Sequence, residues 1–104
     1  MTHDEAKRAL AESRKAIDAL DLRLLELLNE RTRVVEEIGR AKEALDLPIY
    51  EPKREDDVFR NVTDHNRGPL TADAVKGIFE RIIDEMRTLQ RMRRQQREQG
   101  EKEC

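Results

Sequence analysis

The chain is poor in cysteine, in aromatic residues and in long apolar runs. Its single cysteine, Cys104, excludes an internal disulfide framework and favours a reducing compartment. The first twenty residues lack the apolar core of a signal peptide, and no segment approaches the roughly 18 apolar residues of a membrane span. We therefore expect a cytoplasmic protein that is neither secreted through a signal peptide nor embedded in a membrane.

Strand-forming residues are also scarce, because the 104 residues include no Trp, one Tyr and two Phe. The apolar residues are mainly Leu, Ile, Val and Ala, set among Glu, Arg and Lys, a composition typical of all-α proteins. The chain has 21 basic and 23 acidic residues, so no global positive field favours nucleic acid or an anionic membrane. Any anion that binds must be recognised locally.

The first helix is expected over residues 4–45, because this stretch lacks proline and contains Gly39 as its only glycine. Apolar residues recur there at heptad spacing, which indicates a helix that packs along a continuous seam. A few polar residues interrupt this seam. Its two rows are Leu10, Ile17, Leu24, Arg31, Ile38 and Leu45, and Ser13, Leu20, Leu27, Val34 and Ala41.

Proline and glycine delimit two further helices. Pro48 ends the first helix, and Pro52 suits the first turn of the second. Gly68 and Pro69 mark a turn, after which Thr71 can cap a third helix. The chain is thus expected to have an all-α fold of three helices, over residues 4–45, 52–65 and 71–94.

The charged C-terminal segment differs from the rest of the chain. Residues 91–104 are almost entirely Arg, Gln, Glu and Lys, and we expect a fraying helix end and a solvated tail there. No aromatic residue is interleaved for stacking, so nucleic-acid binding is not expected. Residues 1–90 then form one domain.

The length of the first helix predicts a second chain. About 40 residues extend for about 60 Å at 1.5 Å per residue, whereas a compact 100-residue domain has a radius of gyration of about 13 Å. The other helices are too short to cover both ends of the apolar seam. We expect a homodimeric bundle with the long helices entwined. A kink at Gly39, giving a monomeric four-helix bundle, is the alternative.

Charged and amide side chains lie where apolar ones are expected. Arg31 and Lys42 lie on nearly the same helix face, about 16 Å apart. Gln90 continues the apolar row of the third helix. A buried Arg31 needs either an internal counter-ion or an anionic ligand, and spacing alone does not decide between them. The internal candidates are Glu51, Glu55 and Asp21.

Two further features bear on this choice. Arg14 lies about 25 Å along the helix from Arg31, so only an antiparallel partner helix brings it to a shared ligand. Glu51, Arg54 and Glu55 form a compact polar cluster at the start of the second helix, which also suits an ordinary solvated helix start.

A set of segments occurs in the order seen in one known family. The segments are Arg14–Asp21, Leu24–Arg31, Ile38–Lys42, Arg54-Glu55, Asn66–Leu70, Ile78-Phe79, Ile82-Ile83 and Gln90. Together they resemble the all-helical (AroQ-type) chorismate mutases over roughly residues 8 to 91. The resemblance implies an entwined homodimer of three-helix chains, in which each site is completed by an arginine of the other chain.

The resemblance also implies a substrate and a reaction. Chorismate, a dicarboxylate, rearranges to prephenate by a [3,3] shift on the route to phenylalanine and tyrosine, and no metal, cofactor or covalent intermediate is implied. Arg31 and Arg14 of the partner subunit are implied to bind carboxylates. Lys42 and Gln90 are implied to be the catalytic donors to the breaking ether oxygen.

Four more positions match the substrate-binding positions of the family. Glu55 is implied to accept from the ring hydroxyl, and Arg54 to join the polar network around the substrate. Glu51 stands where many relatives carry Asp, and Met86 where some carry a small hydroxyl residue. These two side chains are assigned to the site without a defined contact.

Two other functions fit the same residues. An isochorismate-pyruvate lyase uses a similar cationic pocket, although Arg54 and Glu55 suit the ring hydroxyl of chorismate. A non-catalytic helical dimer that docks to and regulates another shikimate-pathway enzyme would not need Arg31 or Lys42 for turnover. His3 and His65 are too isolated for a metal site.

Overall fold

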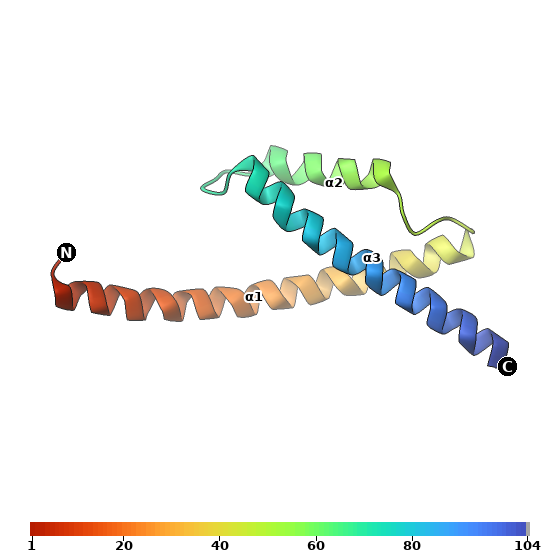
Figure 1. Ribbon diagram of the computed structural model, residues 1–104, viewed down its shortest axis with the longest axis horizontal. Coiled ribbons are helices and arrows are strands. Elements are labelled where there is room, and N and C mark those ends of the chain that lie inside the picture. The colour runs from red at the N-terminus through yellow and green to blue at the C-terminus, as the bar shows by residue number, and fades with distance from the viewer. Residues whose placement is uncertain (104) are drawn as a thin grey trace. The chain divides into compact units, whose positions relative to one another are not determined.

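The computed structural model describes residues 1–103, and these residues form three helices and no strand. The helices are α1 (His3–Ala44), α2 (Pro52–His65) and α3 (Ala72–Glu103) (Figure 1). The predicted all-α, three-helix fold is confirmed. None of these helices carries an apolar stretch long enough to cross a bilayer. Cys104 lies outside the described residues.

Helix α1 runs through Gly39 without a break, so the alternative with a kink at this glycine is wrong. A capping box begins the helix: Glu5 N–H donates to Thr2 Oγ1 (3.1 Å), and Thr2 N–H donates to Glu5 Oε2 (3.3 Å). The chain divides within α1 into two units, Met1–Arg33 and Val34–Cys104, and each is described by itself.

The first unit consists of the N-terminal part of α1 and exposes the predicted apolar seam. Large side chains at heptad spacing are each about half exposed. The rest of the single chain therefore does not cover this seam. The exposed seam residues are Leu10, Ile17, Leu20, Leu24 and Leu27.

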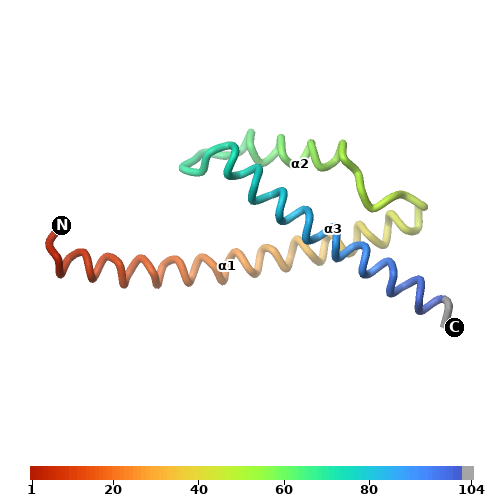
Figure 2. Tube along the Cα trace, viewed as in Figure 1, coloured from red at the N-terminus to blue at the C-terminus, as the bar shows by residue number. Residues whose placement is uncertain are grey.

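The second unit holds the core. Helices α2 and α3 form a hairpin and pack against each other (Figure 2), and side chains of α3 also contact the last turns of α1. The buried apolar side chains are Val35 from α1 and Val75, Ile83 and Met86 from α3. Val75, Ile83 and Met86 follow the helical spacing of the sequence, so α3 contributes the face that its periodicity predicts.

The end of α1 is a Schellman motif with Asp46 in the position that glycine usually takes. Asp46 has a φ of 56°, in the left-handed region. Its N–H donates to Glu43 O (3.1 Å), and Leu47 N–H donates to Lys42 O (2.7 Å). These bonds satisfy carbonyls of the last turn and direct the following loop back over Lys42.

The loop between α2 and α3 is ordered by polar side chains. Asn66 accepts from Gly68 N–H (3.0 Å) and donates to Leu70 O (2.7 Å), and Gly68 adopts a φ of 76°. Thr71 Oγ1 accepts from Ala74 N–H at 3.1 Å. Thr71 is therefore the N-cap of α3, as its position predicts.

The end of α3 differs from the sequence prediction. The sequence pattern predicts an end near Arg94, with a solvated tail after it, but the helix continues to Glu103. Gln, Arg, Glu and Lys are good helix formers, and ion pairs from α3 to Glu36 and Glu43 of α1 anchor the segment. Partners distant in the sequence thus stabilise this helix end.

Candidate active site

Lys42 lies in the last turn of α1 and is held by two contacts. Its Nζ donates to Ile49 O (2.8 Å) and lies 2.8 Å from Glu51 Oε1. Its side chain is 12% exposed. An ammonium group has three N–H donors, so these contacts leave one for a ligand.

Glu51 precedes α2 and orients Lys42. The residue occupies the N-cap position, yet its side chain makes no capping hydrogen bond. Its carboxylate is instead committed to the Lys42 ammonium group. The family resemblance implies that Glu51 belongs to the substrate site and does not predict this pair, because the loop brings the two residues together across nine positions of chain.

Gln90 of α3 lies against the same face of α1 as Lys42. Gln90 Cγ lies 3.7 Å from the position that a Cβ would take on the buried Gly39. Residues three apart share a helix face, so Lys42 follows Gly39 on the side that Gln90 contacts. Met86, one turn before Gln90, is buried in the core beneath. Gln90 therefore packs against α1 within one turn of Lys42.

Glu55, in the first turn of α2, is paired with a residue that sequence reasoning missed. Arg87 of α3 places Nη2 within hydrogen-bond distance of both Glu55 oxygens, and each side chain is 21% exposed. The missed signal was spacing, because Arg87 lies four residues after the core residue Ile83 and thus on the inward side of α3. An internal arginine therefore pairs with this carboxylate.

The three remaining arginines of the predicted site differ in exposure. Arg54 is exposed on α2. Arg14 is exposed and Arg31 is partly buried, and both lie in the first unit. Glu51 and Glu55, considered as internal counter-ions for Arg31, are paired with Lys42 and Arg87 respectively.

A second polar region joins the end of α1 to α3. Arg97 Nε is hydrogen-bonded to Glu43, and Arg93 Nη2 lies 3.9 Å from Glu36. Arg94 donates to Leu47 O (3.1 Å) in the loop that leads to Glu51. The C-terminal part of α3 therefore holds the end of α1 and the loop behind Lys42.

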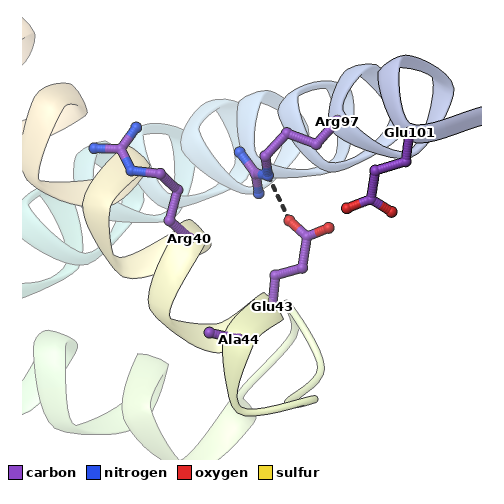
Figure 3. Close-up of a pocket in the computed structure, with 5 residues that line it drawn as sticks. All are labelled: Arg40, Glu43, Ala44, Arg97 and Glu101. Carbon is purple, nitrogen blue, oxygen red and sulfur yellow. Dashed lines mark hydrogen bonds and ion pairs between the residues drawn. The ribbon is translucent and has the colours of Figure 1, made fainter. Parts of the chain in front are cut away.

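A pocket of about 390 Å³ lies beside these contacts (Figure 3). Two arginines and two glutamates surround it, so its charges balance, and none of the predicted site residues lines it. Glu37 is hydrogen-bonded to Arg40 and raises the pKa of that guanidinium above its ordinary value. The lining residues are Arg40, Glu43, Ala44, Arg97 and Glu101.

The fold and the site define an all-helical protein with cationic, amide and carboxylate side chains gathered between helices. Sequence comparison identifies the family: the model of the chorismate mutase type II family matches residues 13–91. The chain belongs to this family, as the resemblance of its motifs predicts.

Among curated relatives, a bifunctional chorismate mutase/prephenate dehydratase of Neisseria gonorrhoeae is 37% identical over 78 residues. The match covers 75% of this chain and 21% of the relative. The chain thus spans about a fifth of the length of this curated relative.

Solved structures of similar chains cover most of the fold. A chorismate mutase (form II) from Thermus thermophilus is 35% identical, with a TM-score of 0.78, and the match covers 80% of this chain and 94% of that one. A chorismate mutase from Helicobacter pylori, solved in complex with prephenate, is 28% identical with a TM-score of 0.75. That match covers 81% of this chain and 91% of the other.

Proposed function

We propose that this chain catalyses the rearrangement of chorismate to prephenate. The family membership supports this reaction, as does the similarity to a chorismate mutase that binds prephenate. Atoms balance within one molecule: the ether C–O bond breaks, a C–C bond forms, and three electron pairs shift around a six-membered array. The protein needs only to orient the substrate and to stabilise charge that develops in the transition state.

The observation that carries the proposal is the packing of Gln90 against Gly39, one turn before the oriented Lys42 on α1. As the ether bond breaks, negative charge grows on its oxygen, and preorganised donors at this atom lower the barrier. The third N–H of Lys42 and the amide of Gln90 are the proposed donors. Ile49 and Glu51 hold the ammonium group in place before the substrate binds, so little reorganisation is needed during the reaction.

The substrate carboxylates require planar cationic donors. We assign them to Arg31 and to Arg14 of the partner subunit, whose guanidinium groups bind carboxylates through paired N–H bonds. This assignment rests on the family resemblance and on helix spacing. Fixing both carboxylates holds the enolpyruvyl arm over the ring, which removes part of the entropic barrier.

The other assigned residues complete the substrate site. Glu55 is the proposed acceptor for the ring hydroxyl, and the exposed Arg54 is free to turn toward a bound anion. Glu51 acts through Lys42, since its carboxylate contacts the ammonium group. Met86 forms part of the apolar floor beneath Gln90.

We further propose that two copies of the chain associate through α1. The exposed seam of Leu and Ile side chains is larger than the scattered apolar residues that a monomer usually leaves in water. Heptad spacing suits a second helix of the same sequence. An antiparallel copy also explains how Arg14 can reach the site. Arg14 is too far along α1 to contact a small ligand that Arg31 of its own chain binds.

Product identification tests the proposed reaction. The purified protein is incubated with chorismate, and separately with isochorismate, and the products are identified by NMR. We expect prephenate from chorismate. Release of pyruvate from isochorismate without prephenate formation would assign the chain to the lyase, and no turnover of either compound would favour a non-catalytic helical dimer.

A further inference from the structure

Arg87 links three elements at the start of α2. Its Nη2 is hydrogen-bonded to both oxygens of Glu55, and its Nη1 lies 3.6 Å from Asp84 Oδ1 on its own helix. The guanidinium carbon lies 4.8 Å from the centroid of the Tyr50 ring, within range of a cation–π contact. Tyr50 directly precedes Glu51, the partner of Lys42.

These contacts restrict the Glu55 carboxylate strongly. A glutamate on a helix ordinarily samples several rotamers in water, but Glu55 is held between α2 and α3 by a charged donor that is itself packed against an aromatic ring. The carboxylate still has acceptor capacity, because its two oxygens offer about four lone-pair sites and Arg87 places a single nitrogen between them.

Arg87 is not placed for stability alone. Its Nε is buried and has no hydrogen-bond partner among the described residues, although an unpaired buried donor lowers stability. A methionine at this position would preserve most of the aliphatic packing without that cost. The presence of an arginine at this position is therefore best explained by the effect of its charge on the Glu55 carboxylate.

We propose that Arg87 is a positioning residue that sets the Glu55 carboxylate for the ring hydroxyl of the substrate. This role rests on the proposed function, because Glu55 is the group that would touch the substrate. Arg87 acts through Glu55 and Tyr50, and makes no contact with the reacting atoms. It thereby favours a ring that carries a hydroxyl at the position facing α2.

A double-mutant cycle on chorismate turnover tests this role. We expect Arg87→Met to lower kcat/KM about tenfold and Glu55→Gln to lower it at least as much. The double variant should be no slower than Glu55→Gln alone, because residues that act through one another are not additive. Arg87→Lys should restore part of the rate, since an ammonium group still pairs with the carboxylate but loses the planar contact with Tyr50.

The matched control is Arg81→Met, which removes an arginine of the same helix that pairs with Glu85 at the surface. Its kcat/KM should equal that of the unmodified chain. If Arg87→Met does not fold, as judged by circular dichroism, Arg87→Lys in the wild-type and Glu55→Gln backgrounds replaces it in the cycle. A loss with Arg87→Lys that disappears in the Glu55→Gln background then supports the role.

Additive effects, or an unchanged rate for Arg87→Met in an active protein, would overturn the role of Arg87 and leave the proposed reaction standing. Absence of chorismate turnover by the unmodified chain would overturn the proposed reaction, and this role with it. Turnover of chorismate by the unmodified chain is therefore measured first, because it separates failure of the proposed reaction from failure of the proposed role of Arg87.

Discussion

Gln90 packs against Gly39, with its Cγ 3.7 Å from the position of a glycine Cβ. This contact ties the amide of α3 to the face of α1 that also carries Lys42. The amide does not titrate, so the donor that it supplies is the same at every pH of interest. Activity should therefore respond to any change that makes this donor titratable.

Replacing Gln90 by Glu should make activity depend on acid pH. A carboxyl group donates only when it is protonated, which occurs below its pKa, about 4.3 for an unperturbed glutamate. The rate of Gln90→Glu should therefore rise as the pH falls from 8 toward 4 and should be about 10²-fold below wild type at pH 7.5. Steady-state kcat/KM measured against pH checks this.

The control for that experiment is Gln95→Glu, an exposed position on the same helix. Its pH profile should match that of the unmodified chain. A Gln90→Glu variant with wild-type rate at pH 7.5 would show that the amide is not a donor in the transition state.

Lys42→Met should lower kcat by about 10²–10³-fold, because it removes the charged donor proposed for the ether oxygen. Lys53→Met removes an exposed lysine of α2 and serves as the control, with an unchanged rate. Circular dichroism reports whether Lys42→Met stays folded, since Lys42 also binds Ile49 O and Glu51. Equal kcat for the two variants would remove Lys42 from the mechanism.

Mixing two inactive variants tests the shared site. In a heterodimer of Arg14→Ala and Lys42→Ala chains, one of the two sites receives both an intact Lys42 and an intact Arg14 from the other subunit. We expect random exchange to restore roughly a quarter of the wild-type rate, since about half of the molecules are heterodimers with one working site each. Mass spectrometry verifies the exchange, and a mixture that stays inactive despite it argues against Arg14 acting across the interface.

Asp46→Gly should stabilise the fold by about 0.5–1 kcal/mol, because the left-handed conformation at Asp46 strains a side chain with a Cβ and suits glycine. Thermal unfolding at a fixed protein concentration measures the change. Asp46→Asn removes the charge near the C-terminal end of the α1 dipole but keeps the Cβ, so it should gain less. Equal gains in the two variants would assign the effect to charge and not to the backbone.

Local signals in the sequence located the helices well. Proline and glycine act on their own neighbours, so Pro48, Pro52 and Thr71 marked boundaries that the structure reproduces within one residue for α1, α2 and the start of α3. The end of α3 was misplaced, because charged residues continue a helix when distant partners such as Glu36 and Glu43 are available. That information is absent from the local segment.

The residue types of the proposed site follow from the sequence, because charges and an amide interrupt apolar rows at Arg31, Lys42 and Gln90. The ion-pair partners of the charged residues could not be predicted. Glu55 and Arg87 are 32 residues apart in the chain, and Arg97 and Glu43 are 54 apart. Several acidic residues could each have paired with a given basic residue, so the sequence offered no basis for choosing the partner.

The sequence by itself determined the three helices, apart from the end of α3, and which faces are apolar, since these follow from interactions among residues a few positions apart. Only the tertiary structure decided that Glu51 holds Lys42 and that Arg87 holds Glu55. The reason is the short range of ion pairs and hydrogen bonds: they form only where the packed helices bring two groups within a few ångströms of each other.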